Sequence, residues 1–243
     1  ASLRNRPYPP PRRIFGHEIF NTTSLTFEPA MNIATPPDYR LGPGDEVIID
    51  MWGDNQVSLR GTVSPDGTVF VSGIGPVQLN GRTVEEANKT LRHKFAGAFM
   101  GVDTGGGNIS LTLGQIRTIQ INVMGEVLVP GTYTLSSFAT VFYALYRSGG
   151  INDIGSLRNI SVVRNGKRVA VIDIYEYILG GQHSDFVRLE DGDVILVPPY
   201  DRLVEIEGNV KRPMYYEMKE GETLSTLIDF SGGFTGDAYS RSL

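Results

Sequence analysis

Cysteine is absent from the 243 residues of the chain. This absence excludes disulfides, thiolate catalysis and metal sites built on thiolates. Long apolar runs are missing as well, since none approaches the roughly 18 to 20 residues that a membrane-spanning helix needs. The net charge is −5 and no long basic run interrupts it. The sequence therefore carries no electrostatic footprint for nucleic acid.

Catalytic and metal-binding patterns are equally scarce. The three histidines, His17, His93 and His183, share no metal-ligand spacing on one element, so we expect surface positions for them. No Gly-x-Ser-x-Gly elbow occurs, and Gly105-Gly106-Gly107 lacks the Lys and the helix of a phosphate-binding loop. Paired carboxylates of the glycosidase type are the remaining enzyme alternative. Most acidic residues, however, occupy predicted turns and caps, and we predict no catalytic site, no cofactor and no metal.

Glycine and proline, at 29 and 14 residues, are frequent enough to predict many turns and short elements. Residues 1–37 are polar and interrupted by prolines, which predicts an extended lead-in, with structure beginning near Tyr39. The lead-in contains the one basic cluster of the chain, Arg4, Arg6, Arg12 and Arg13. Because prolines resist helix, we interpret the cluster as an extended arm, with a docking arm for a neighbour as the alternative.

The stretch 38–116 predicts a first domain of short strands with one helix. Val47–Met51 is an apolar run behind a Gly-Asp turn and predicts a strand. Asp66-Gly67 lies between two β-prone segments and predicts a hairpin. A Gly-Asp turn recurs at Gly192-Asp193, again before a predicted strand, but such turns are common and the signal is weak.

The clearest helix in the sequence begins at Thr83. Thr83 and Glu86, three residues later, form a capping box. Gly97 is the predicted end of the helix. Its apolar positions fall on one face, namely Val84, Ala87, Leu91 and Phe95.

From residue 117 onward the sequence repeats itself. Ile121–Val127 returns as Val204–Val210, and Ser148-Gly149-Gly150 returns as Ser231-Gly232-Gly233, in both cases 83 positions later and without gaps. Each copy predicts a strand, a glycine turn, a second strand, a short helix and a Gly-Gly end. We therefore predict tandem modules at residues 117–200 (module 1) and 201–243 (module 2). We expect module 2 to be truncated in this sequence.

Module 1 continues beyond its helix. Two β-prone runs, Ile160–Arg164 and Arg168–Ile172, flank Asn165-Gly166-Lys167 and predict a hairpin. Asp173 predicts the cap of a short helix. Asp193–Val197 predicts a last strand, which ends at two prolines.

These motifs resemble those of the outer-membrane polysaccharide export family. The first domain resembles the polysaccharide export domain, and each repeat resembles the SLBB module, which has a β-grasp-like fold. The segments that carry the resemblance are Tyr39–Val47, Val63–Gly75, Gly81–Ala87, Val123–Val127 with Pro130-Gly131 and Ser148–Gly150, and residues 203–234. The fold expected from it is α+β, with tandem small mixed β-sheet modules and short helices.

The resemblance also implies a function. It implies a homo-oligomeric ring that forms a hydrated conduit for capsular or extracellular polysaccharide, with an inner-membrane polysaccharide co-polymerase as partner. The family's lipidated cysteine and membrane-spanning C-terminal helix are not in this sequence. We therefore expect this stretch to lie in the periplasm, associated with the outer membrane only in the full-length protein.

Three aromatic residues are candidate saccharide contacts: Trp52, Tyr215 and Tyr216. Such rings can stack on sugars, but they also fill cores, and for Trp52 we favour a core position. A second interpretation comes from Tyr216–Leu224, which resembles the start of a LysM domain. LysM domains bind N-acetylglucosamine polymers, so the alternative function is a cell-wall glycan-binding module without a transport role. The 83-residue repeat is too long for a LysM array.

Overall fold

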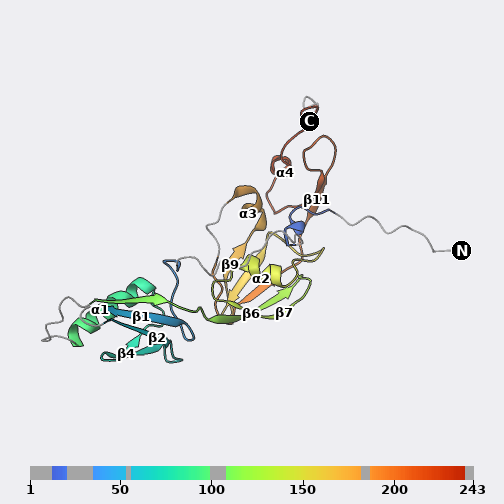
Figure 1. Ribbon diagram of the computed structural model, residues 1–243. Helices are drawn as coiled ribbons and strands as arrows, with labels where there is room; N and C mark the ends of the chain where they lie inside the picture. The colour runs from blue at the N-terminus through green and yellow to red at the C-terminus, as the bar shows by residue number, and fades with distance from the viewer. Residues whose placement is uncertain (1–12, 21–34, 53–55, 99–107, 182–186, 239–243) are drawn as a thin grey trace. The chain divides into compact units, whose positions relative to one another are not determined.

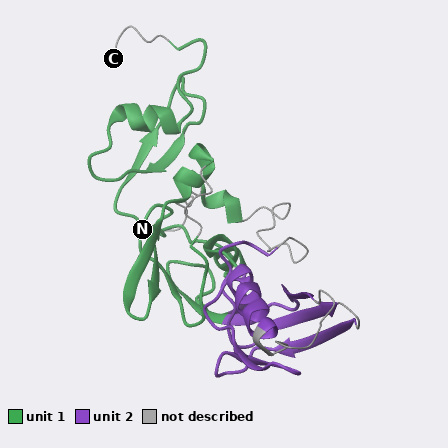
Figure 2. Cartoon of the chain, turned by 90° about the vertical axis from the view of Figure 1, so that its left-hand side faces the viewer, with its two compact units in different colours: residues 1–28, 120–133, 139–243 green, residues 29–119, 134–138 purple. Residues whose placement is uncertain are grey.

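The computed structural model of the protein describes residues 13–20, 35–52, 56–98, 108–181 and 187–238. Short strands and helices alternate along it, which confirms the predicted α+β class (Figure 1). The chain divides into two compact units (Figure 2). Unit 1 comprises residues 1–28, 120–133 and 139–243, and unit 2 comprises residues 29–119 and 134–138.

Unit 2 is built around a three-stranded antiparallel sheet. Its strands are β2 (Val57–Thr62), β1 (Glu46–Trp52) and β5 (Asn108–Leu113), in the order β2-β1-β5. Val47 and Ile49 alternate with more exposed residues along β1, as a half-covered strand requires, and are 0% and 1% exposed. The sheet, helix α1 (Val84–Ala98) and a second hairpin enclose one apolar core.

The start of α1 confirms the predicted capping box. The Glu86 amide donates to the Thr83 hydroxyl at 3.2 Å, and the Thr83 amide donates to the Glu86 carboxylate at 2.9 Å. These two bonds satisfy amides that have no partner inside the helix. The predicted end at Gly97 is wrong by a small margin, because the helix runs to Ala98.

The predicted hairpin at Asp66-Gly67 is wrong, although the turn itself is present. Gly67 has φ +80° and its amide donates to the Ser64 carbonyl. However, β2, which precedes the turn, pairs with β1 and not with β3. Strand β3 (Thr68–Val71) pairs instead with β4 (Gly75–Gln78), so the hairpin forms one turn later in the chain.

Module 1 forms a five-stranded sheet in the order β7-β6-β10-β8-β9. Its predicted hairpin is confirmed, because Asn165 and Gly166 both have positive φ in the tight turn between β8 and β9. β10 lies at the centre of the sheet, parallel to β6 and antiparallel to β8. The elements are β6 (Thr118–Gly125), β7 (Gly131–Ser136), α2 (Val141–Arg147), β8 (Ile160–Arg164), β9 (Lys167–Ile172), α3 (Ile174–Gly180) and β10 (Val194–Val197).

Module 2 repeats the first half of module 1 in three dimensions. Its elements are β11 (Leu203–Ile206), β12 (Met214–Glu217) and α4 (Leu224–Phe230). Helix α4 begins and ends 83 positions after α2. The Gly-Gly ends match as well: the Gly150 amide donates to Leu145 at 2.8 Å, and the Gly233 amide donates to Ile228 at 2.9 Å. The predicted repeat is therefore a structural one.

The two copies differ in how much of their apolar surface is covered. Ile121 and Val141 are 0% and 1% exposed in module 1, whereas their equivalents Val204 and Leu224 are 37% and 58% exposed in module 2. In module 1 the strands β10 and β8 extend the sheet beyond β6, and no equivalent of these strands occurs among the described residues of module 2.

The N-terminal segment corrects the expectation that structure begins near Tyr39. Ile14 forms a parallel bridge with Tyr215, and the Phe15 amide donates to the Tyr215 carbonyl at 2.9 Å. A short 3-10 helix, η1 (His17–Phe20), follows. Ile14, Phe15 and Phe20 are all at least nine-tenths buried. The sequence concealed this packing because the three apolar residues follow no helical or strand period.

A matched pair of glycines tests the central parallel strand. Gly125 and Gly208 are equivalent and have φ near +85°, but a Cβ at Gly125 would lie 2.0 Å from the Val197 carbonyl oxygen, whereas nothing lies within 4 Å at Gly208. We expect Gly208→Ala to lower the free energy of unfolding by about 1 to 2 kcal/mol, from backbone conformation alone. Gly125→Ala should lower it by several kcal/mol more, because β10 must move. Thermal unfolding followed by circular dichroism measures both, and equal losses would contradict the β6–β10 pairing.

Candidate functional site

The three aromatic residues singled out in the sequence lie in different units and have different surroundings. Trp52 lies at the end of β1 in unit 2 and is 44% exposed, so the favoured core position is wrong. Tyr215 lies on β12 in unit 1, partly buried, with its backbone bonded to the N-terminal segment. Tyr216 is 0% exposed, and its hydroxyl donates to the Arg212 carbonyl at 2.9 Å. A buried ring cannot stack on a sugar, so Tyr216 is a core residue.

The other candidate chemistries find no support in the described residues. His17 lies in η1 and His93 is exposed on α1, while His183 and Gly105-Gly106-Gly107 lie outside the described residues. In the part of the chain that the structure describes, no group of three or more His, Asp or Glu side chains could hold a metal ion. No helix there is long and apolar enough to cross a membrane.

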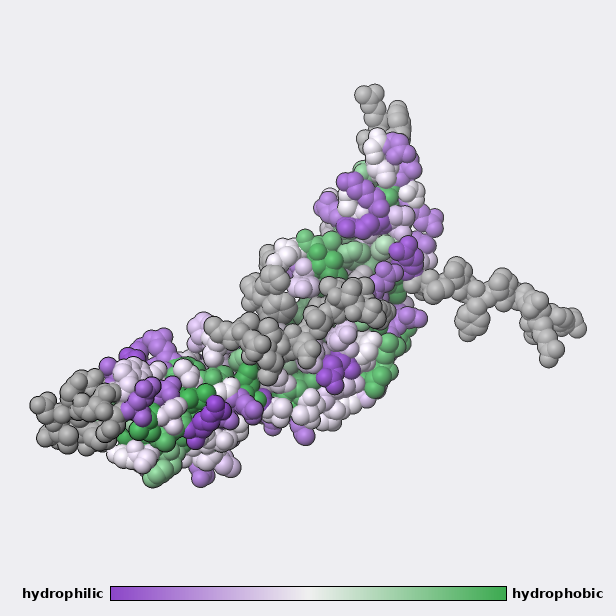
Figure 3. Space-filling model, in the orientation of Figure 1, coloured by the Kyte–Doolittle hydropathy of each residue, from purple (hydrophilic) through white to green (hydrophobic). Residues whose placement is uncertain are grey.

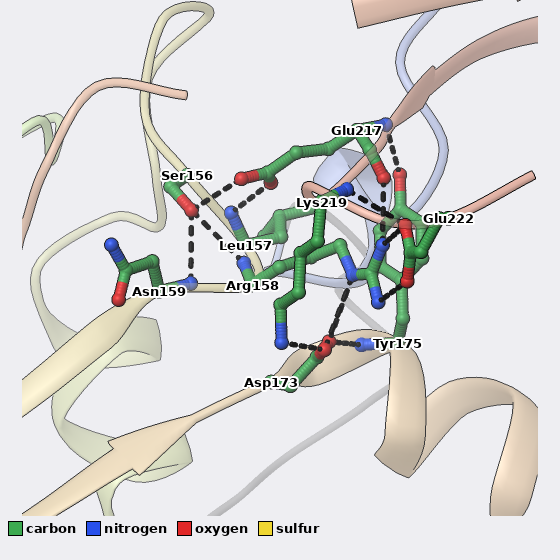
Figure 4. Close-up of polar contacts among 9 residues, drawn as sticks. All are labelled: Ser156, Leu157, Arg158, Asn159, Asp173, Tyr175, Glu217, Lys219 and Glu222. Carbon is green, nitrogen blue, oxygen red and sulfur yellow. Dashed lines mark hydrogen bonds and ion pairs between the residues drawn. The ribbon is translucent and has the colours of Figure 1, made fainter. Parts of the chain in front are cut away.

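The most concentrated polar arrangement in unit 1 surrounds Arg158, between module 1 and module 2 (Figure 4). We call it the Arg158 joint. Module 1 contributes Ser156, Leu157, Arg158, Asp173 and Tyr175, and module 2 contributes Glu217, Lys219 and Glu222. Asp173 holds its place as the cap of α3, accepting a hydrogen bond from the Tyr175 amide at 2.9 Å.

Arg158 is the centre of the joint, and its side chain is only 6% exposed. It forms a bidentate pair with Glu222, in which two guanidinium nitrogens each lie 2.7 Å from a carboxylate oxygen. Its Nε donates to Asp173 at 3.1 Å. The guanidinium also lies over the rings of Tyr175 and Phe230, at 4.8 and 5.0 Å from their centroids. A buried charge needs such complete pairing, because its hydration is lost.

The Glu217 carboxylate anchors module 2 to the other side of the joint. It accepts from the Ser156 hydroxyl at 2.5 Å and from the Leu157 amide at 2.8 Å. The Glu217 amide in turn donates to the Tyr175 hydroxyl at 2.9 Å. Lys219 adds a second cation, 2.7 Å from Asp173. The joint therefore links backbone and side chains of both modules.

Burial and pairing shift the two glutamates in opposite directions. Burial raises the pKa of Glu217 above its ordinary value, and the hydrogen bonds from Ser156 and Leu157 offset only part of that effect. Burial also acts to raise the pKa of Glu222, but the bonds from Arg158 and Lys219 outweigh it and hold that pKa low. Carboxylates with divergent pKa values can serve acid–base chemistry. Here both carboxylates form hydrogen bonds with module 1 in the contact between the two modules. Their role in the structure is to hold module 2 against module 1.

The two Gly-Asp turns, which gave only a weak signal in the sequence, form a second polar arrangement. Asp45 and Asp193 are both 0% exposed, and each accepts at 2.8 Å from the amide three residues before it. Each also pairs with an arginine, Arg117 at 2.5 Å and Arg164 at 2.8 Å. The Gly-Asp turns are thus the same structural device, used before β1 and before β10. The arginine partners could not be assigned from sequence, because they lie 72 and 29 positions away.

Comparison with known proteins now matches these parts to families. Residues 33–103 match the polysaccharide biosynthesis/export protein model, and residues 120–173 and 203–243 match the SLBB domain model. The chain therefore combines a polysaccharide export domain with SLBB domains. Its first domain is the export domain, and the two repeats that share the Arg158 joint are SLBB domains.

Two curated relatives come from Escherichia coli, and both are named polysialic acid transport protein KpsD. Each is 28% identical to the chain over 226 residues, which is 90% of this chain and 39% of the relative. The chain thus spans about two fifths of the length of the relatives it matches.

Loss of the central arginine should be severe. Arg158→Met would leave Asp173 and Glu222 buried beside each other without their shared cation. We expect the free energy of unfolding to fall by about 3 to 5 kcal/mol, the range for a broken buried ion pair. Arg168→Met, at an exposed position on β9, is the control and should change it by less than about 0.5 kcal/mol. Urea denaturation measures both, and a loss below about 1 kcal/mol for Arg158→Met would contradict the joint.

The joint also predicts two opposite pH dependences. The lowered pKa of Glu222 gives stability that is present above pH 4.5 and is lost as pH falls below it. The raised pKa of Glu217 gives stability that is present below pH 4.5 and is lost as pH rises above it. The advantage of the wild type over Glu222→Gln should therefore grow with pH, whereas its advantage over Glu217→Gln should shrink. Unfolding measured from pH 3.5 to 7 tests this, and parallel curves would contradict the assignment.

Proposed function

We propose that the chain is the periplasmic part of an outer-membrane exporter and forms a layer of a ring-shaped conduit for capsular or extracellular polysaccharide. The observation that carries the proposal is the order of the matched domains, an export domain followed by two SLBB domains. The two relatives from Escherichia coli are named polysialic acid transport proteins. The partners in this proposal are the polysaccharide, further copies of the chain and an inner-membrane polysaccharide co-polymerase.

The physical properties of the joint support such a role. A conduit for a moving polymer has to keep its bore while it offers only weak contacts to the polymer. Arg158 and Glu217 bond the two SLBB domains through buried charges rather than through a flexible linker. Rigid stacked modules present several faces at fixed heights, and closed rings need such repeatable heterologous interfaces.

The proposal includes no catalysis. Glu217 and Glu222, whose pKa values are shifted in opposite directions, are enclosed in the Arg158 joint. Among the described residues, the remaining buried aspartates Asp45 and Asp193 hold turns. Polymer contacts in this proposal come from exposed aromatic residues, of which Trp52 is the largest among those described.

A LysM-type binding module is the less supported function. The segment that suggested it, Tyr216–Leu224, falls inside the second SLBB match. In the structure it contains the end of β12, a turn with Glu222 in the Arg158 joint, and the start of α4.

Ring formation is the first test of the proposed function. We expect the full-length protein, extracted from the membrane, to give a single mass in native mass spectrometry that corresponds to a closed ring of identical copies. Cells that lack the gene should lose surface polysaccharide and regain it with the wild type. The Arg158→Met variant should restore less, because its modules are no longer fixed. A strict monomer that restores export would contradict the ring, and normal export without the gene would contradict the function.

A further inference from the structure

A small pocket of about 230 Å³ opens at the surface of unit 1, where the N-terminal segment meets module 2. Its lining includes Arg13, Phe15 and Glu18 from the N-terminal segment and Arg212 and Met214 from module 2. Hydrophilic residues dominate the surface of module 2 on the face drawn in Figure 3. Two of the seven lining residues are arginines and one is acidic, in a chain whose net charge is −5.

The wall of the pocket is fixed by backbone pairing. The Tyr215 amide donates to the Arg13 carbonyl at 3.0 Å, and the Phe15 amide donates to the Tyr215 carbonyl at 2.9 Å. The Phe15 ring is 8% exposed and stacks on Tyr216 with centroids 5.2 Å apart. The Arg13 side chain therefore extends from a backbone segment that is hydrogen-bonded to β12 on both sides of Ile14.

Among the described residues, Arg212 is held in place by a ring and a carbonyl and forms no ion pair with an acidic side chain. Its guanidinium lies 5.4 Å from the Phe15 ring centroid, and its Nη2 donates to the Phe230 carbonyl at 2.8 Å. Among the described residues this is its one side-chain hydrogen bond. A guanidinium carries five N–H donors, so most of its capacity is available for a ligand.

Arg13 is paired only loosely. Its Nε lies 3.9 Å from the Glu18 carboxylate, and the two side chains are 70% and 77% exposed. An exposed pair at that distance contributes little, and an incoming anion can take its place.

The repeat shows that this charge belongs to the second copy alone. Arg212 and Lys211 occupy the positions of Val129 and Leu128 in module 1, which are 58% and 57% exposed. The loop keeps its backbone in both copies, since Val127 and Val210 make the same bond to the glycine two residues before them. The exchange of apolar for basic side chains is therefore not required by the fold.

We propose that this pocket binds an acidic sugar unit of the polysaccharide, with Arg13 and Arg212 contacting its carboxylate. The proposal rests on the proposed function and adds a substrate class to it. A planar carboxylate accepts two parallel bonds from a guanidinium, which point charges such as Lys cannot reproduce. The exposed site gives weak binding, with a dissociation constant of about 1 mM. Weak binding suits a conduit, because the polymer must leave again.

The test is a titration of the 243-residue chain, followed by amide chemical shifts in NMR. The probe is a sialic acid tetramer, and maltotetraose is the neutral control. We expect saturable shifts at Arg13–Glu18 and Met214 with the acidic probe alone. Arg212→Gln and Arg13→Gln should each weaken binding about tenfold. Lys211→Gln removes the same charge from a residue that does not line the pocket, and should weaken binding less than about twofold.

Several outcomes would overturn the proposal. These are no shift with the acidic probe, equal shifts with maltotetraose, or an equal loss of affinity in Lys211→Gln, which would indicate unspecific charge attraction. Arg13→Gln separates loss of binding from loss of folding. Because that side chain is mostly exposed, the melting temperature of the variant should match that of the wild type. Surface polysaccharide in cells separates the two hypotheses. If export is normal but the tetramer does not bind, the pocket fails and the exporter stands, whereas a wild type that does not restore export removes the exporter as well.

Discussion

The structure of the two SLBB domains depends on the burial of one positive charge. Arg158 belongs to module 1, yet its strongest partner, Glu222, belongs to module 2. Module 1 supplies only the Asp173 carboxylate, so without Glu222 the buried guanidinium would lose its bidentate partner, which is strongly unfavourable. The two domains are thereby required to meet in one arrangement. The same arrangement brings neighbouring groups into contact. The Glu217 amide donates to the Tyr175 hydroxyl, and the Phe15 ring packs against the Tyr175 ring.

One segment of the repeat differs in its chemistry between the two copies. Residues 134–138 belong to unit 2, where the Ser137 hydroxyl lies 3.0 Å from the Tyr39 hydroxyl. The equivalent residues of module 2, 217–221, begin with Glu217 in the Arg158 joint. Both places combine a tyrosine hydroxyl with an arginine near its ring, Arg117 at Tyr39 and Arg158 at Tyr175.

Local signals allowed the sequence to predict the helices, and non-local contacts explain what it missed. The capping box at Thr83 is a local motif, so α1 was predictable. The helices α2 and α4 were predictable because the same short motifs recur 83 positions apart. The partner of a four-residue strand such as β10 is not a local property, so its central parallel position was not predicted. The Arg158 joint could not be predicted for the same reason, because Arg158 and Glu222 are 64 positions apart in the sequence.

Differences between the copies are more informative about function than their similarities. The shared features, such as the positive φ of Gly125 and Gly208, follow from the backbone and would be needed whatever the domains did. The charges of Glu217 and Glu222 have no counterpart in module 1, where Thr134 and Ala139 stand, and they build the joint. Arg212 likewise replaces an exposed valine and lines the pocket. The backbone of the repeat requires none of these charges, and those of Glu217 and Glu222 instead fix the contact between the two modules.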